Sequence, residues 1–204
     1  MNKKIIIFGG GKIGRSFIGQ LFSSGGYEVV FVDISVPVIT ELNKRGSYEV
    51  VIKSVTDTTI VVKNVRGVDA RNEKLVAQEI GDASILAVSV GLNALPHIIP
   101  LIAKGLKERY ELDKNSAIDI IIAENMRNAA QYFTEQLSKY LPAEYPLDGL
   151  VGLVETSIGK MVPIMPEKIE KEDVLRVFAE PYNTLILDKK AFKNPIPDIK
   201  GLSP

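Results

Sequence analysis

Four glycines stand close together near the start of the chain, where residues 8–14 read Phe-Gly-Gly-Gly-Lys-Ile-Gly. Glycine loses more backbone freedom on folding than any other residue, so such a cluster is costly inside regular structure. The apolar run Ile5-Ile6-Ile7 precedes it and is typical of a buried strand. Apolar residues at helical spacing follow it as far as Gly25-Gly26. A strand that enters a helix through glycines therefore constrains the fold more than any other part of the chain.

Further elements continue this alternation. A strand over 28–33 and a short helix over 38–44 complete a β-α-β-α order, which predicts a parallel sheet with helices on its faces. Beyond residue 71 the pattern predicts helices over 72–80, 93–110 and 127–140, and strands over 84–88, 117–123 and 150–155.

Two regions depart from that rhythm. Tyr48, Val50 and Ile52 alternate with polar residues, as do Ile60, Val62 and Val65, so we expect an antiparallel excursion with one buried face. The proline-rich tail has short strand-like pieces over 174–178 and 184–187. We therefore divide the chain into a core over 1–155 and a strand-containing extension of the same domain over 156–204.

The glycines match the spacing Gly9-x-Gly11-x-x-Gly14 between a strand and a helix. In that setting they allow a tight turn, close approach of a pyrophosphate and close packing of helix on strand, and the helix start attracts phosphate. Asp33 ends the second strand 19 positions after Gly14, where a carboxylate accepts hydrogen bonds from the adenosine ribose. The pattern predicts a Rossmann-type, doubly wound α/β fold that binds NAD rather than NADP. The alternative is a ligand-free turn in which Asp33 only caps the next helix.

Other candidate residues follow strand ends at the same edge of the sheet. Lys12 and Ile13 lie within the turn, and Lys12 and Arg15 are either phosphate contacts or solvated charges. Val90 and Gly91 end the strand over 84–88, where a loop either passes beside the dinucleotide or only turns the chain.

The segment Ala123-Glu124-Asn125-Met126 also follows a strand. Asn125 is either a hydrogen-bond donor to a carbonyl or developing alkoxide, or the N-cap of the next helix. Glu155 ends a strand and points at the site or at water. We interpret His97 as a surface or packing residue rather than a catalytic base, and the charged run over 167–173 as a solvated connection.

The composition excludes several classes of function. The 25 basic and 25 acidic residues give a formal net charge of zero, without the basic excess of a nucleic-acid-binding protein. No apolar run reaches the roughly 20 residues of a membrane span, and we expect no secretory leader. The 204 residues include no cysteine and one histidine, so we expect no metal site and a cytoplasmic protein.

Taken together, several sequence blocks resemble the NAD-dependent polyol dehydrogenases of the long-chain mannitol dehydrogenase family. The blocks are FGGGKIGRSFIG, VFVD, VG with IPLIAKGL, IAENM, and, in the tail, VP and LDK. The resemblance implies a Rossmann-type domain in which Gly9, Gly11, Gly14 and Asp33 hold NAD. It places Asn125 beside the reacting carbonyl, and implies a polyol or sugar phosphate substrate.

The chain also departs from that family. The family's general base is a lysine in a Lys-x4-Asn-x2-His pattern of a helical C-terminal domain, and no lysine here has that context. We therefore expect the cofactor domain alone, without the helical catalytic domain. Gly159-Lys160 replaces a common Asp-Arg pair, and Lys12 replaces a frequent Asn. A related polyol or hexuronate oxidoreductase, a non-catalytic NAD(H)-sensing module and a domain that binds no nucleotide stay open, as does the oligomeric state.

Overall fold

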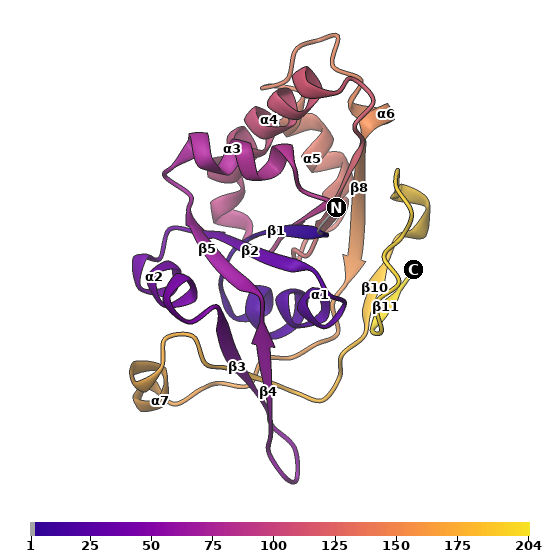
Figure 1. The fold of residues 1–204 in the computed structure, drawn as a ribbon. Helices are drawn as coiled ribbons and strands as arrows, with labels where there is room; N and C mark the ends of the chain where they lie inside the picture. Colours follow the sequence, from indigo (N-terminus) through magenta and orange to yellow (C-terminus); the bar gives the residue numbers. More distant parts are fainter. Residues whose placement is uncertain (1–2) are drawn as a thin grey trace.

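A computed structural model describes residues 3–204 and has an eight-stranded sheet at its centre, in the order β11-β10-β8-β7-β6-β1-β2-β5 (Figure 1). Six of these strands are parallel neighbours. They are β1 (Lys4–Phe8), β2 (Glu28–Asp33), β5 (Val65–Asp69), β6 (Ile85–Val88), β7 (Ile118–Ile122) and β8 (Val151–Ser157). Numbered along the chain, these six lie in the order 3-2-1-4-5-6, which is that of a dinucleotide-binding Rossmann sheet. The predicted fold class is confirmed.

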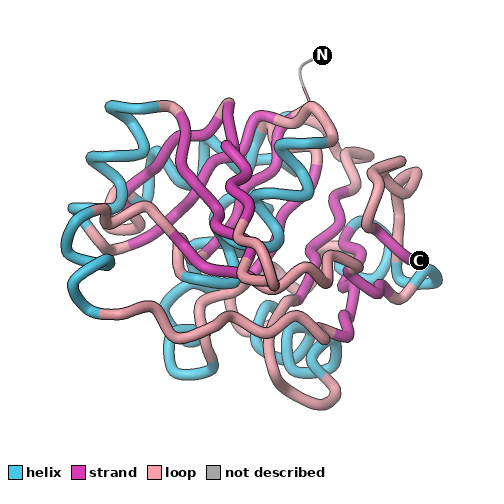
Figure 2. The backbone as a smooth tube through the Cα atoms, turned by 90° about the horizontal axis from the view of Figure 1, so that it is seen from below, coloured by secondary structure: helices cyan, strands magenta, loops and turns pink. Residues whose placement is uncertain are grey.

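Helices cover both faces of this sheet, and Figure 2 shows the strands grouped between them. One face carries the helical residues 12–24, which comprise a π-helix (Gly14–Gly19) and α1 (Gln20–Ser24), together with α2 (Val36–Arg45). The other face carries α3 (Glu73–Gly81), α4 (Leu95–Leu112) and α5 (Ala129–Leu137). The last two begin two residues later than the sequence predicts, because a 3-10 turn (Leu92–Ala94) and a turn before Ala129 precede them.

The continuous apolar run of β1 follows from this layering. Ile5 and Ile7 belong to the core on the α1 and α2 face, whereas Ile6 and Phe8 belong to the core on the other face. All four side chains are fully buried. A strand covered on both faces needs apolar residues at every position, so it does not alternate.

The antiparallel excursion is smaller than expected. β3 (Ser47–Ile52) pairs antiparallel with β4 (Thr58–Lys63), and the hairpin projects from the domain in Figure 1. Val65, predicted to belong to this excursion, instead begins β5 and pairs in parallel with Val29 of β2. The prediction was wrong because one residue, Asn64 at φ 57°, separates β4 from β5, and the chain passes there from the small sheet to the large one.

The tail folds onto both sheets. A segment that includes α7 (Glu167–Glu172) leaves β8, and β9 (Val177–Ala179) pairs in parallel with β3. β10 (Leu185–Leu187) then joins β8 antiparallel, a 3-10 turn (Lys189–Ala191) follows, and β11 (Leu202–Ser203) ends the sheet. A short helix, α6 (Leu147–Leu150), precedes β8. The charged run over 167–173, expected as a solvated connection, is mainly an exposed helix.

Buried Asp119 on β7 anchors this tail. Its carboxylate accepts hydrogen bonds from the backbone N–H of Lys193 at 2.7 Å and of Asn194 at 3.1 Å. Gly152 on β8 leaves room for the carboxylate, since a Cβ there would lie 2.0 Å from Asp119 Oδ1.

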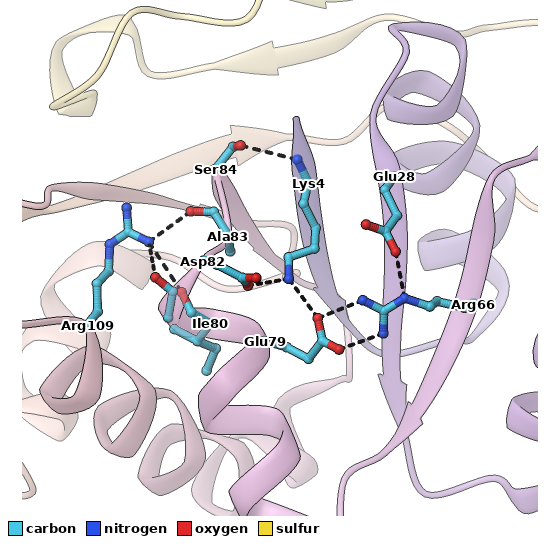
Figure 3. A network of polar contacts seen from close by, with 10 residues as sticks. Lys4, Glu28, Arg66, Glu79, Ile80, Asp82, Ala83, Ser84 and Arg109 are labelled. Atoms are coloured by element: carbon cyan, nitrogen blue, oxygen red, sulfur yellow. Dashed lines mark hydrogen bonds and ion pairs between the residues drawn. The ribbon is translucent and has the colours of Figure 1, made fainter. Parts of the chain in front are cut away.

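A network of charged side chains joins the amino-terminal ends of β1, β2 and β5 to α3 (Figure 3). Glu79 accepts hydrogen bonds from Lys4 Nζ at 2.8 Å and, through both oxygens, from Arg66 at 2.6 and 2.7 Å. Arg66 also donates to Glu28 at 2.6 Å, and Lys4 also pairs with Asp82. The Glu79 carboxylate therefore links β1 with β5, and Arg66 extends the network to Glu28 of β2. Among residues 3–204, no helix has both the length and the apolar character needed to cross a membrane.

Candidate functional site

The glycine turn brings the ends of β1 and β6 into close contact. Gly9 has φ +100°, and a Cβ there would lie 2.3 Å from the carbonyl oxygen of Ser89. A Cβ on Gly14 would lie 2.0 Å from the carbonyl oxygen of Gly9. Gly11 differs, because nothing lies within 4 Å of a Cβ built there. Two glycines thus close the turn, and the third leaves its outer side open.

Asp33 lies at the end of β2, beside this turn. Its Oδ2 accepts a hydrogen bond from the backbone N–H of Gly10 at 2.7 Å, and its Oδ1 accepts one from Ser35 at 2.8 Å. The carboxylate therefore connects the glycine turn with the start of α2. It also lines a pocket next to Gly11, so its contact with Ser35 is only part of its surroundings.

Two pockets meet at the carboxyl ends of the parallel strands. The first has a volume of about 510 Å³ and is lined by residues that include Gly9, Gly11, Asp33, Ser89, Val90 and His97. The second has a volume of about 550 Å³ and is lined by Ile13, Ser89, Gly91, Ala123, Glu124, Asn125, Met126, Thr156, Ser157 and Ile158. Ser89 lines both, so the segment after β6 separates the two pockets. In open α/β sheets, ligands bind at this edge, where the strand order reverses.

Seven of the predicted site residues line these pockets, and two lie elsewhere. Gly14 is buried beneath the turn and acts by closing it. Lys12 Nζ forms an ion pair of 2.9 Å with Glu170 of α7. The structure thus gives Lys12 a carboxylate partner at the side of the turn.

Arg15 fits neither expectation, since it is neither a solvated charge nor a residue of either pocket. It is buried, and its Nη1 donates to the carbonyl oxygen of Val174 at 2.7 Å. Burial lowers the pKa of its guanidinium, although nearby acidic groups and Tyr48 act in the opposite direction. Within the described chain, its Nε atom is buried without a hydrogen-bond partner.

Asn125 is exposed and lines the second pocket. It does not cap the next helix, because α5 begins at Ala129 and its N-cap position is Asn128, at φ 53°. Glu155 contributes to capping instead: its carboxylate accepts a hydrogen bond from the backbone N–H of Ala130 at 2.9 Å, rather than pointing at the pocket or only at water. His97 is exposed in the first turn of α4 and lines the first pocket.

Glu124 is the residue that sequence reasoning missed. Its Oε1 accepts hydrogen bonds from the backbone N–H of Val90 at 2.6 Å and of Gly91 at 3.0 Å. Burial raises the pKa of this carboxyl more than the two backbone hydrogen bonds lower it. An acidic residue next to Asn125 at a strand end was the available signal.

Lys160, in the pair that departs from the family pattern, is buried in the loop after β8. Its Nζ donates to the carbonyl oxygen of Tyr182 at 2.8 Å and to Asn183 Oδ1 at 3.0 Å, and lies 5.1 Å from the centre of the Phe17 ring. Burial lowers its pKa to about 8. The side chain therefore fastens the segment after Ile158 to the tail and to the π-helix.

Proteins of known sequence and structure resemble this chain over almost its whole length. Mannitol-1-phosphate 5-dehydrogenase of Lactococcus lactis subsp. lactis (strain IL1403) is 37% identical over 203 residues, which are 98% of this chain and 52% of the relative. The protein of the same name from Streptococcus mutans serotype c is 34% identical and is matched over 50% of its length. The chain thus spans about half the length of the curated relatives it matches.

Mannitol 2-dehydrogenase of Pseudomonas fluorescens, solved as a ternary complex with NAD and D-mannitol, has the same fold. It superposes with a TM-score of 0.79 over 100% of this chain and 53% of its own, at 13% sequence identity. The sequence pattern described as "Mannitol dehydrogenase Rossmann domain" matches residues 3–201. The chain therefore belongs to the mannitol dehydrogenase family, of which it carries the Rossmann domain.

Proposed function

We propose that this chain is the NAD-binding domain of a polyol-phosphate dehydrogenase that interconverts mannitol 1-phosphate and fructose 6-phosphate. The observation that supports it best is the open side of Gly11 next to the Asp33 carboxylate at the first pocket. The names of the relatives at 34–37% identity supply the substrate.

The residues present fit a dinucleotide. The absence of a Cβ at Gly11 leaves space where a diphosphate approaches the backbone, next to the start of the helix over 12–24. The first N–H groups of a helix have no partner within it and attract anions. In this proposal Gly9, Gly11, Ile13 and Gly14 form the diphosphate site, with Lys12 at its side, and the Asp33 carboxylate binds the adenosine ribose.

The remaining residues serve the other half of the cofactor and the substrate. Val90 and Gly91 lie where the two pockets meet, and Asn125 lies in the second pocket. NAD, when bound, accepts or supplies the hydride. The amide of Asn125 donates a hydrogen bond to the substrate oxygen, whose negative charge grows as the carbonyl is reduced. We propose that a second, helical domain supplies the lysine that moves the hydroxyl proton.

Asp33→Asn should weaken NAD binding by about 10-fold to 100-fold, because hydrogen bonds to charged groups contribute roughly 1.5–3 kcal/mol. It should also reduce the preference for NAD over NADP, since the carboxylate no longer repels a 2′-phosphate. Calorimetric titration with both dinucleotides measures both effects. Asp148→Asn on exposed α6 is the matched control. Unchanged NAD affinity in Asp33→Asn would contradict the role given to Asp33.

The 204-residue chain should bind NADH yet oxidise no mannitol 1-phosphate by itself, because it lacks the Lys-x4-Asn-x2-His pattern. An absorbance assay at 340 nm with saturating NAD tests whether the chain oxidises mannitol 1-phosphate. A chain that binds NADH and turns over mannitol 1-phosphate would show that its own residues include the base. A chain that binds no NADH would remove the proposed function altogether.

A further inference from the structure

Glu124 lines the second pocket and contacts the segment that separates it from the first. Two successive backbone N–H groups, those of Val90 and Gly91, converge on its carboxylate at 2.6–3.1 Å. Gly91 has φ +84°, a conformation that few other residues adopt. Glu124 thus holds the segment after β6 to the end of β7, directly beside Asn125.

Burial of the ionised Glu124 carboxylate opposes stability. Burial raises the pKa of Glu124 more than the two backbone hydrogen bonds lower it, so the folded state favours the protonated form relative to an exposed glutamate. The free energy of unfolding therefore falls as the pH rises from the ordinary glutamate pKa through the raised one. An ionised group that costs stability at a pocket is typical of a functional position.

We propose that Glu124 is a positioning residue for the dinucleotide: its carboxylate fixes Val90 and Gly91 at the junction of the two pockets and keeps Asn125 in place beside them. The inference rests on the function proposed above. Successive backbone N–H groups attract anions, so the carboxylate also fills a site that would compete with the helix start for the diphosphate. The diphosphate then binds at the helix start alone, and the dinucleotide has a single position along the two pockets.

Few other charges surround Glu124. Among the described residues, no charged side chain contributes to its pKa shift, which arises from burial and the two backbone hydrogen bonds. The titratable groups of the surrounding segments are occupied or turned elsewhere. Lys12 pairs with Glu170, Glu155 binds Ala130, His97 lines the other pocket and Arg127 is exposed.

Glu124→Gln tests the proposal by calorimetric titration of the whole chain with NAD between pH 5 and pH 8. The neutral amide of glutamine has a single acceptor oxygen for the two backbone N–H groups and binds them more weakly than the carboxylate does. We therefore expect the Kd for NAD at pH 7.5 to rise about tenfold. In the unsubstituted protein the Kd should rise as the pH falls through the raised pKa of Glu124, and in Glu124→Gln this rise should be absent. All other residues are the same in both proteins, so the difference between the two profiles reports on position 124 alone. Glu124→Asp should recover part of the affinity.

Thermal unfolding separates positioning from a structural role. The melting temperature of Glu124→Gln should be unchanged or higher at pH 7.5, because the neutral amide avoids the cost of a buried charge. The matched control is Glu155→Gln, which also removes a charged acceptor from a backbone N–H at a strand end. It should lower the melting temperature and leave the Kd unchanged.

Two results would overturn the inference while the proposed function stands. One is a Glu124→Gln protein with the affinity and pH profile of the unsubstituted protein. The other is weaker binding explained by a lower melting temperature. If the unsubstituted chain binds no NAD, the proposed function fails, and this inference fails with it.

Discussion

Gly14→Ala should destabilise the domain by about 3 kcal/mol or more, at the upper end of the range for overpacking. The added Cβ would lie 2.0 Å from the carbonyl oxygen of Gly9 and 3.1 Å from Ser89 Oγ. The first of these neighbours is backbone held between β1 and β6, so it cannot rotate away as a flexible side chain would. The turn must open, and NAD binding should be lost with it. Urea unfolding followed by circular dichroism measures the change in the free energy of unfolding.

Gly11→Ala is the matched control, because the same substitution three residues earlier meets open space. Nothing lies within 4 Å of its Cβ, and its backbone is outside the positive-φ region. Its stability should change by no more than about 0.5 kcal/mol, while NAD affinity should fall at least tenfold, since the methyl group occupies the space proposed for the diphosphate. Equal stability of the two variants would contradict the close contact of Gly14, and normal binding by Gly11→Ala would contradict the placement of the diphosphate.

Glu79→Ala should destabilise the protein by about 3–5 kcal/mol, the usual cost of breaking a buried ion pair from one side. The side chain of Lys4 is 9% exposed and would keep only Asp82, whose side chain is 74% exposed. Arg66 would keep Glu28 alone (Figure 3). Thermal and urea unfolding at neutral pH measure the loss.

The same substitution should change the acid sensitivity. Burial by itself raises the pKa of Glu79, but its hydrogen bonds and charge pairing with Arg66 and Lys4 outweigh it, so the pKa lies below the ordinary 4.5. A carboxyl whose pKa is lowered by folding stabilises the protein above its ordinary pKa, and this contribution disappears as the pH falls through the lowered value. The unsubstituted protein should therefore lose stability below about pH 4.5 by a larger amount than Glu79→Ala.

Glu111→Ala provides the comparison for an exposed pair. Glu111 is bound to Lys114 at 2.9 Å, and both side chains are more than half exposed. Exposed ion pairs contribute about 0–1 kcal/mol, so this variant should be nearly as stable as the unsubstituted protein. If Glu79→Ala behaved like Glu111→Ala, the network around Glu79 would be of no consequence for stability.

Local patterns in the sequence predicted much of the fold. Buried parallel strands are short apolar runs, and the glycine turn with Asp33 has a fixed spacing, so β1, β2 and the first pocket could be located. β5 was not recognised as a separate parallel strand, because Val65 continues the alternation of β4 across a single residue of positive φ at Asn64. Periodicity does not record a change of sheet that takes place across a single residue.

The partners of charged residues were harder to predict, since they depend on distant parts of the chain. Arg15 is bound by the carbonyl oxygen of Val174, 159 positions later, and Glu124 by the N–H groups of a segment 33 and 34 positions earlier. A charge next to a glycine turn has the same sequence signature whether it faces phosphate or a backbone carbonyl. For Arg15 the partner is a backbone carbonyl because the tail packs against the π-helix and places Val174 beside it.

The parallel pairing of β3 with β9 has a consequence for synthesis in the cell. Val50 of β3 cannot pair with Val177 of β9 until Val177 has emerged from the ribosome. This takes on the order of ten seconds longer at ordinary rates of translation. Throughout that interval one side of the hairpin presents unpaired amide and carbonyl groups to every nascent chain nearby. Slower elongation between these two strands should increase misassembly of the newborn polypeptide, and chaperones that shield strand edges should relieve it.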